Sequence, residues 1–333
     1  ICIQPIPIAG FTYTQSPVCA PSVVAFVDTS NYLEDTCGQR DVLWSVSPLI
    51  NSCNLSGGFN FVNGTNPNSV NPEIEFAGAG EYTVTQTITN PCGTSAYSEV
   101  ITVKGEPIVS ITPIADVCAD ELVINPSASI LNCFGDTSNY NWSFPGGTPS
   151  NSNLANPTNI VYSSIGTYTI TLVFSNECGL DTATESFTLK PVPSADAGID
   201  TSICIGESVT LGGSPAASGG NGVYSYNWIT APNIANPIIT PTTSTTYILQ
   251  VTSDNCVGED TVNVTVNPLP VVLTSPDVSI CINDSTQLTA SGGVTYIWTP
   301  SAGLSDTSIS NPMASPSVTT TYTVSVTDSN GCE

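Results

Sequence analysis

The sequence predicts an all-β protein built from tandem sandwich repeats, and three observations support this prediction. Runs such as 82–88 and 261–266 alternate apolar and polar residues or are β-branched, as half-buried strands do. Clusters of Gly, Pro, Asn and Asp separate these runs, and no helical periodicity persists between them. The order Cys, Trp, Tyr, Cys recurs four times along the 333 residues, which indicates four copies of one unit.

Each repeat has a tryptophan in a short strand-like segment and a tyrosine that opens a late alternating strand. Seven or so short strands in roughly 70 to 100 residues, with these two markers, are typical of an immunoglobulin-like β-sandwich. The markers, which we expect in the cores, are Trp44, Trp142, Trp228, Trp298, Tyr82, Tyr168, Tyr247 and Tyr322. Tyr224, Tyr226 and Trp228 alternate and could form a sugar-stacking face, but the recurrence of the tryptophan favours core packing.

A segment that alternates and then ends in proline closes three of the repeats, at 101–107, 187–193 and 264–270. It reads as a last strand followed by a stiff linker, so the repeats are expected to form an elongated rod. The predicted domains are the last strand of a preceding repeat (1–7), three complete repeats (8–105, 106–191 and 192–268), and a fourth repeat that lacks its final strand (269–333).

Residues 1–7 match the closing segments although no repeat precedes them, which leaves two interpretations. The chain continues into further repeats beyond its ends, or residues 1–7 of one copy complete the fourth repeat of a neighbour by strand addition. The second interpretation would make a polymer.

Charge and cysteine content indicate where such a protein would work. Three Lys and Arg face 27 Asp and Glu, and the net charge of -24 disfavours nucleic acid and anionic membranes as partners. No apolar run reaches the ~18 residues of a membrane span. Twelve cysteines without a histidine or a Cys-x-x-Cys pair predict structural disulfides and an extracellular location.

The simplest cysteine pairing closes each repeat on itself. The predicted bridges are Cys19–Cys92, Cys118–Cys178, Cys204–Cys256 and Cys281–Cys332, with an additional Cys37–Cys53 bridge in the first repeat. Cys2 and Cys133 are left over as unpaired or intermolecular candidates.

Candidates for chemistry are few. Without histidine the chain lacks the usual base of nucleophilic catalysis, and we expect no enzyme active site and no cofactor. Asp196 and Asp200 flank the entrance to the third repeat and are weak candidates for a calcium site, although solvated carboxylates are the simpler reading. Lys104 and Lys190 recur at the ends of closing strands and are expected to be solvated.

Residues 279–332 and 194–213 resemble the PKD-like and Ig-like repeats of giant cell-surface adhesins of Bacteroidota, including gliding-motility adhesins exported by the type IX system. The W-x-F-G-D-G signature of PKD domains is matched in part by WSFPGG at 142–147. The resemblance implies a structural or adhesive segment of a secreted surface fibre or stalk that is stapled by disulfides, carries load, and has further repeats or other copies as partners.

Two other functions fit the same pattern. One is a glycan- or protein-binding module, for which the long insert of the first repeat (54–73) with Phe59 and Phe61 is the best candidate. The other is the spacer of a secreted enzyme, because such repeats also link catalytic domains.

Overall fold

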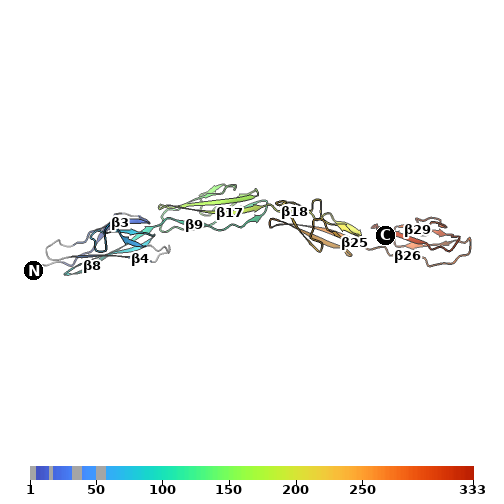
Figure 1. Cartoon of the computed structure of the whole chain (residues 1–333), viewed down its shortest axis with the longest axis horizontal. Helices are drawn as coiled ribbons and strands as arrows, with labels where there is room; N and C mark the ends of the chain where they lie inside the picture. Colours follow the sequence, from blue (N-terminus) through green and yellow to red (C-terminus); the bar gives the residue numbers. More distant parts are fainter. Residues whose placement is uncertain (1–4, 15–17, 32–39, 50–57) are drawn as a thin grey trace. The chain divides into compact units, whose positions relative to one another are not determined.

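The computed structural model describes residues 5–14, 18–31, 40–49 and 58–333 (Figure 1). These residues form strands, turns and loops, and no helix is found among them. Accordingly, the described part of the chain contains no helix that could cross a membrane. The chain divides into two compact units, Ile1–Leu189 and Lys190–Glu333, and each holds two of the repeats.

The first repeat is a sandwich of two four-stranded sheets. Their strand orders are β1-β3-β6-β5 and β2-β8-β7-β4. The strands are β1 (Phe11–Tyr13), β2 (Val18–Cys19), β3 (Ser22–Asp28), β4 (Asp41–Pro48), β5 (Phe59–Phe61), β6 (Glu73–Phe76), β7 (Gly80–Asn90) and β8 (Gly93–Lys104). Alternate residues of β4 and β7 are buried, so the two inner faces enclose one apolar core around Trp44.

The second repeat has a five-stranded sheet and two strand pairs. The sheet has the order β10-β17-β16-β13-β14, and the pairs are β9 with β12 and β11 with β15. The strands are β9 (Ile108–Ile111), β10 (Val117–Cys118), β11 (Leu122–Ile124), β12 (Ala128–Leu131), β13 (Asn139–Ser143), β14 (Asn151–Ser152), β15 (Ile160–Tyr162), β16 (Gly166–Ser175) and β17 (Leu180–Lys190). Trp142 and Phe144 lie fully buried in its core.

The third repeat follows the same plan with shorter strands. Its sheet has the order β19-β25-β24-β22, beside the pairs β18 with β21 and β20 with β23. The strands are β18 (Pro193–Ala195), β19 (Thr201–Cys204), β20 (Val209–Thr210), β21 (Ala217–Gly219), β22 (Ser225–Ile229), β23 (Ile238–Ile239), β24 (Thr245–Ser253) and β25 (Cys256–Asn267). Trp228 and Tyr247 lie in its core.

The fourth repeat consists of three strand pairs, β26 with β28, β27 with β30, and β29 with β31. The strands are β26 (Leu273–Thr274), β27 (Thr286–Gln287), β28 (Ala290–Ser291), β29 (Thr295–Thr299), β30 (Met313–Ala314) and β31 (Thr323–Thr327). Trp298 and Val326 are buried between them. All four tryptophans are thus core residues, whereas Tyr168 and Tyr322 are only partly buried.

Two of the marker tyrosines form a tyrosine corner, a feature of immunoglobulin-like folds in which the hydroxyl bonds to the backbone a few residues upstream. The Tyr82 hydroxyl donates to the Gly78 carbonyl at 2.8 Å, and the Tyr168 hydroxyl donates to the Ser164 carbonyl at 2.5 Å. Tyr82 and Tyr168 therefore tie β7 and β16 to the turns that precede these strands.

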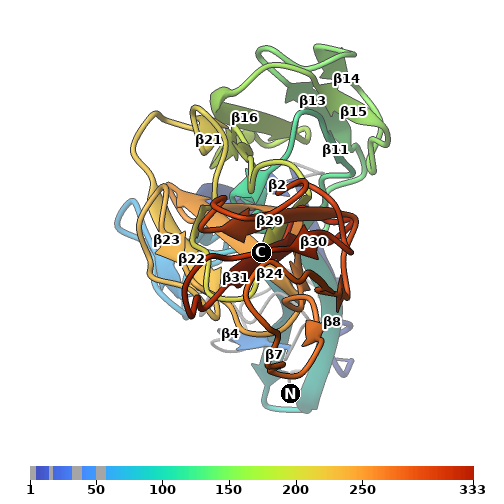
Figure 2. The ribbon, with the colours of Figure 1, turned by 90° about the vertical axis from the view of Figure 1, so that its right-hand side faces the viewer.

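The placement of the cysteines follows from one parallel strand pairing in each of two repeats. β2 runs parallel to the end of β8, so Cys19 lies opposite Lys104. β19 runs parallel to the end of β25, so Cys204 lies opposite Asn267. In both repeats the second cysteine lies where the last strand begins. Cys92 lies in the turn of the β7–β8 hairpin (Figure 2), and Cys256 is the first residue of β25.

Candidate functional site

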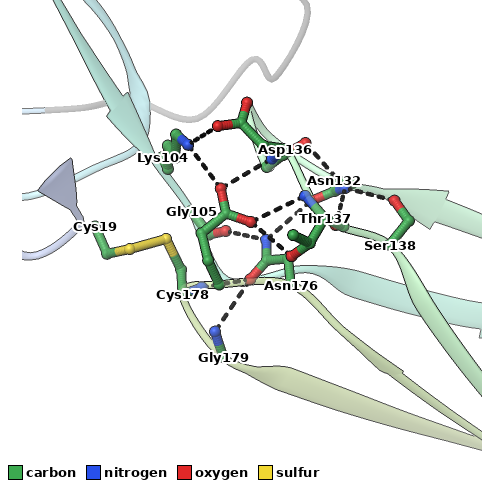
Figure 3. A network of polar contacts seen from close by, with 12 residues as sticks. Cys19, Lys104, Gly105, Asn132, Asp136, Thr137, Ser138, Asn176, Cys178 and Gly179 are labelled. Atoms are coloured by element: carbon green, nitrogen blue, oxygen red, sulfur yellow. Dashed lines mark hydrogen bonds and ion pairs between the residues drawn. A yellow bond between two sulfur atoms is a disulfide. The ribbon is translucent and has the colours of Figure 1, made fainter. Parts of the chain in front are cut away.

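A disulfide joins the first repeat to the second. Cys19 bonds to Cys178, which lies in the β16–β17 turn, and their Cα atoms are 5.5 Å apart (Figure 3). The predicted bridges Cys19–Cys92 and Cys118–Cys178 are therefore wrong. The first cysteine of a repeat bonds to the second cysteine of the next repeat.

The length of β8 explains why Cys19 cannot bond to Cys92. Cys92 precedes the first residue of β8, and Cys19 lies opposite its last residue. A strand of 12 residues spans roughly 40 Å, whereas the Cα atoms of a disulfide lie about 4.4–6.8 Å apart. The two cysteines of one repeat therefore lie at opposite ends of the sandwich.

The same arrangement joins the third and fourth repeats. Cys204 bonds to Cys332 with a Cα separation of 5.5 Å, which shows that the predicted bridges Cys204–Cys256 and Cys281–Cys332 are wrong. β25 is as long as β8 and separates Cys204 from Cys256 in the same way. The Cys332 amide donates to the Asp328 carboxylate at 2.9 Å, and this bond lowers the pKa of Asp328.

A buried lysine that pairs with two carboxylates lies beside the Cys19–Cys178 bond. Lys104, the last residue of β8, contacts the Asp136 carboxylate at 2.5 Å and the Glu177 carboxylate at 2.8 Å, both in the second repeat (Figure 3). The Lys104 side chain is only 8% exposed. The hydrogen bond to Asp136, and then the one to Glu177, raises the pKa of Lys104.

Glu177 organises the loop that it faces. Besides Lys104, it accepts hydrogen bonds from the Asp136 amide at 2.8 Å and from the Thr137 amide and hydroxyl at 3.1 and 2.8 Å. These donors, with the Lys104 bond as the largest contribution, hold the pKa of Glu177 well below its ordinary value of 4.5. The carboxylate thus stays ionised and keeps the 136–137 loop against the end of β8.

The linker backbone is held from the second repeat as well. The Gly105 amide donates to the Cys133 carbonyl at 3.0 Å, and its carbonyl accepts from the Asn176 side chain at 2.7 Å. The Asn176 carboxamide oxygen in turn accepts from the Cys178 and Gly179 amides. Asn176 therefore shapes the turn that presents Cys178 and also grips the linker.

Small apolar residues fill the remaining space at the junction. Ala79 of the first repeat and Cys133 of the second are 3% and 1% exposed, and Leu131 and Phe134 pack against them. A Cβ atom added at Gly105 would lie 2.8 Å from the Cβ of Ala79, so only glycine lets the linker pass this closely. We call this set of covalent, polar and apolar contacts between the first two repeats the junction.

The junction predicts a pH dependence. Because the pKa of Glu177 is lower in the folded protein, the unfolded chain binds more protons as pH falls below 4.5, and stability is lost in that range. The raised pKa of Lys104 acts on the alkaline side. The stability that Lys104 contributes is present below pH 10.5 and is lost as the pH rises above that value. Urea unfolding across pH should therefore give a plateau between about pH 6 and 10.

The carboxylate can be tested separately. Glu177→Gln should reduce the loss of stability on the acid side, because the residue no longer titrates, while Glu121→Gln at an exposed position should leave the acid side unchanged. An unaltered acid side in Glu177→Gln would contradict the role of this carboxylate in the junction.

The other described cysteines divide into bonded and free residues. Cys118, Cys133 and Cys256 are each disulfide-bonded, while Cys92 and Cys281 are free and exposed. The prediction for Cys133 offered an unpaired or an intermolecular residue, and the first of these is wrong. Cys133 is disulfide-bonded and buried in the junction. Cys2 and the predicted Cys37–Cys53 bridge lie outside the described residues.

The expectation that both closing-strand lysines are solvated is also wrong. Lys104 is buried in the junction, and the Lys190 side chain is 17% exposed and lies 3.6 Å from the Asp254 carboxylate. Both lysines pair with carboxylates distant in sequence, which the strand pattern around each lysine does not reveal.

The carboxylates considered for calcium accept hydrogen bonds from backbone amides. Asp196 accepts from the Gly198 amide at 2.9 Å, and Asp200 accepts from the Asn263 amide at 2.8 Å, which lowers the pKa of Asp200. Within the described residues, no group of three or more His, Cys, Asp or Glu is placed to hold a metal ion. Calcium binding at these two residues stays a prediction.

The aromatic candidates for ligand binding pack inward. Phe59 and Phe61 are partly buried against the core of the first repeat. Tyr224 and Tyr226 pack against the core that contains Trp228, whose indole nitrogen donates to the Ile234 carbonyl at 2.9 Å. These contacts favour core packing over an open sugar-stacking face.

Comparison with known proteins finds one matching domain family and a set of similar solved structures. Residues 123–188 match the PKD domain family. No curated protein matches the chain. Tandem immunoglobulin-like domains are found among similar solved structures, although their TM-scores support no argument about function. Residues 123–188, which include the WSFPGG segment at 142–147, are thus similar to a PKD domain.

Three of these structures illustrate the likeness. An I-band fragment of titin is 10% identical with a TM-score of 0.32, and the match covers 80% of this chain and 100% of that one. Extracellular domains 3–5 of Drosophila OTK are 11% identical with a TM-score of 0.37, covering 79% and 100%. Three N-terminal domains of the Highly Immunogenic Outer Capsid protein of bacteriophage RB49 are 14% identical with a TM-score of 0.37, covering 78% and 99%.

Proposed function

We propose that this chain is a structural segment of an extracellular fibre or stalk of a bacterial surface adhesin, and that it transmits tension instead of catalysing a reaction. The observation that carries the proposal is the pair of disulfides, Cys19–Cys178 and Cys204–Cys332, each of which joins successive repeats. A bond inside one repeat would protect that repeat alone. A bond between repeats also protects the joint.

The position of each bond sets the path of a pulling force. Cys19 and Cys178 are 159 residues apart in sequence, and Cys204 and Cys332 are 128 apart. Tension applied outside such a pair passes through the sulfur atoms, so the residues in between carry little of it. The hairpins β7–β8 and β24–β25 lie within these closed loops and are shielded from extension.

Noncovalent contacts add resistance to bending at the first joint. Lys104 and Gly105 are contacted from three segments of the second repeat, through Asp136, Cys133 and the Asn176–Glu177 pair. A disulfide alone leaves rotations about its bonds, whereas these contacts hold the linker on several sides.

The setting of the proposal rests on chemistry and resemblance. Disulfides persist in oxidising compartments, which supports an extracellular location. The resemblance of residues 279–332 to repeats of surface adhesins supports the assignment to a bacterial fibre or stalk.

Single-molecule force spectroscopy on the chain, held at its two ends, tests the proposal. Oxidised protein should extend little, and reduction should add length, on the order of 50 nm for the first loop alone at about 3.3–3.6 Å per residue. Cys92→Ser serves as the matched control, because Cys92 is free, and it should behave like the parent in both states. Equal fully extended lengths with and without reductant would refute the proposal.

A further inference from the structure

Cys92 and Cys281 are the free thiols among the described cysteines, yet both occupy positions that are bonded in sister repeats. Cys92 lies in the turn before the last strand, as Cys178 does in the second repeat. Cys281 is the first cysteine of the fourth repeat, as Cys19 and Cys204 are of theirs. The two thiols therefore correspond to the two halves of one inter-repeat bond.

The end of the first repeat that carries Cys92 is already built like the junction. Asn90 accepts from the Cys92 and Gly93 amides at 2.9 and 3.1 Å, as Asn176 does in its own turn. The Asn90 side chain also donates to the Pro5 carbonyl at 3.0 Å, which parallels the bond from Asn176 to Gly105.

The linker residue that follows, Ile6 or Glu106, also contacts the same place in each turn. A Cβ added at Gly93 would lie 3.5 Å from the Ile6 side chain, and one added at Gly179 would lie 2.8 Å from the Glu106 side chain. Residues 5–6 thus sit on the Cys92 turn as residues 105–106 sit on the Cys178 turn. The receiving surface is formed, and its thiol is exposed.

The Cys281 end presents the complementary cysteine. The Cys281 carbonyl accepts from the Asp284 amide at 3.0 Å, and the Cys204 carbonyl accepts from the Glu207 amide at the same distance. Residues 278–281 form no strand, although Thr201–Cys204 pairs with β25. Val278 and Ile282 are 57% and 79% exposed, so this edge is open to a partner.

We propose that Cys92 of one copy forms a disulfide with Cys281 of a second copy, joining chains head to tail. This inference rests on the structural role proposed above, and the partner in the fibre is a second copy of the chain. The oxidant is a small disulfide such as glutathione disulfide. The Cys92 thiolate attacks it and releases one glutathione thiolate, and the Cys281 thiolate then attacks the Cys92 sulfur and releases the second, so two electrons pass to glutathione.

Mixing two variants of the whole chain in a glutathione redox buffer tests this bond. The parent should form dimers and longer chains on non-reducing gels. Cys92→Ser alone and Cys281→Ser alone should stay monomeric, and their equimolar mixture should give dimers only, with a Cys92–Cys281 peptide found by mass spectrometry. Physiological ionic strength is needed, because a net charge of -24 on each copy opposes association.

A relocated thiol controls for simple exposure. The variant C92S/T167C moves the thiol to an exposed residue of β16. It should give no dimers when it is mixed with Cys92→Ser, which supplies the Cys281 thiol. The inference is overturned if single variants dimerise as readily as the mixture, if Thr167→Cys substitutes for Cys92, or if both thiols end as glutathione adducts. None of these results affects the force measurement, which depends on bonds within one copy.

Discussion

Replacing Cys19 and Cys178 together by serine is expected to lower the free energy of joint unfolding of the first two repeats by about 5 kcal/mol. Their bond spans a sequence separation of 159 residues, and a loop of this length removes much conformational freedom from the unfolded chain. Native-state hydrogen exchange in urea, read on peptides from β7 and β16, measures the change repeat by repeat.

Cys92→Ser provides the control for this experiment, because it removes an exposed free thiol from the turn that matches that of Cys178. It should alter the unfolding free energy by less than about 0.5 kcal/mol. Unchanged exchange in the double variant would show that the bond does not couple the two repeats.

Trp228→Ala is expected to destabilise the third repeat by about 3–5 kcal/mol. The side chain is 3% exposed, and truncation would leave a cavity in the core and remove the indole bond to the Ile234 carbonyl. Exchange of β24 peptides measures the loss. If Trp228 served as a sugar platform, the variant would instead retain stability and lose glycan binding.

Ile229→Ala is the matched control, because Ile229 follows Trp228 on β22 and is 45% exposed on the opposite face. We expect a change within about 0.5 kcal/mol. Equal losses in the two variants would contradict the assignment of Trp228 to the core.

The cores could be predicted from sequence because each marker acts within its own repeat. Burial of Trp44 or Trp142 depends on the alternation of its own strand and on strands nearby in the chain, and both are visible as local patterns. The Asn-x-Cys-Gly turns at 90–93 and 176–179 carried a further signal, since an Asn side chain commonly caps such a turn. That signal could have identified Asn176 as a junction residue.

The ion pair of the junction had no comparable signal. Lys104 meets carboxylates 32 and 73 positions further along the chain, and nothing in the pattern around Asp136 or Glu177 marks them as its partners. Such contacts depend on which end of one repeat faces which turn of the next.

The all-β fold and the burial of the four tryptophans followed from local patterns, because each tryptophan lies in a strand of alternating apolar and polar residues. Disulfide pairing was decided by tertiary structure, since sequence order alone made Cys19 and Cys92 partners. The parallel pairing of β2 with β8 carries Cys19 to the far end of the sandwich. There the nearest cysteine belongs to the next repeat, and a bond expected to staple one domain joins two.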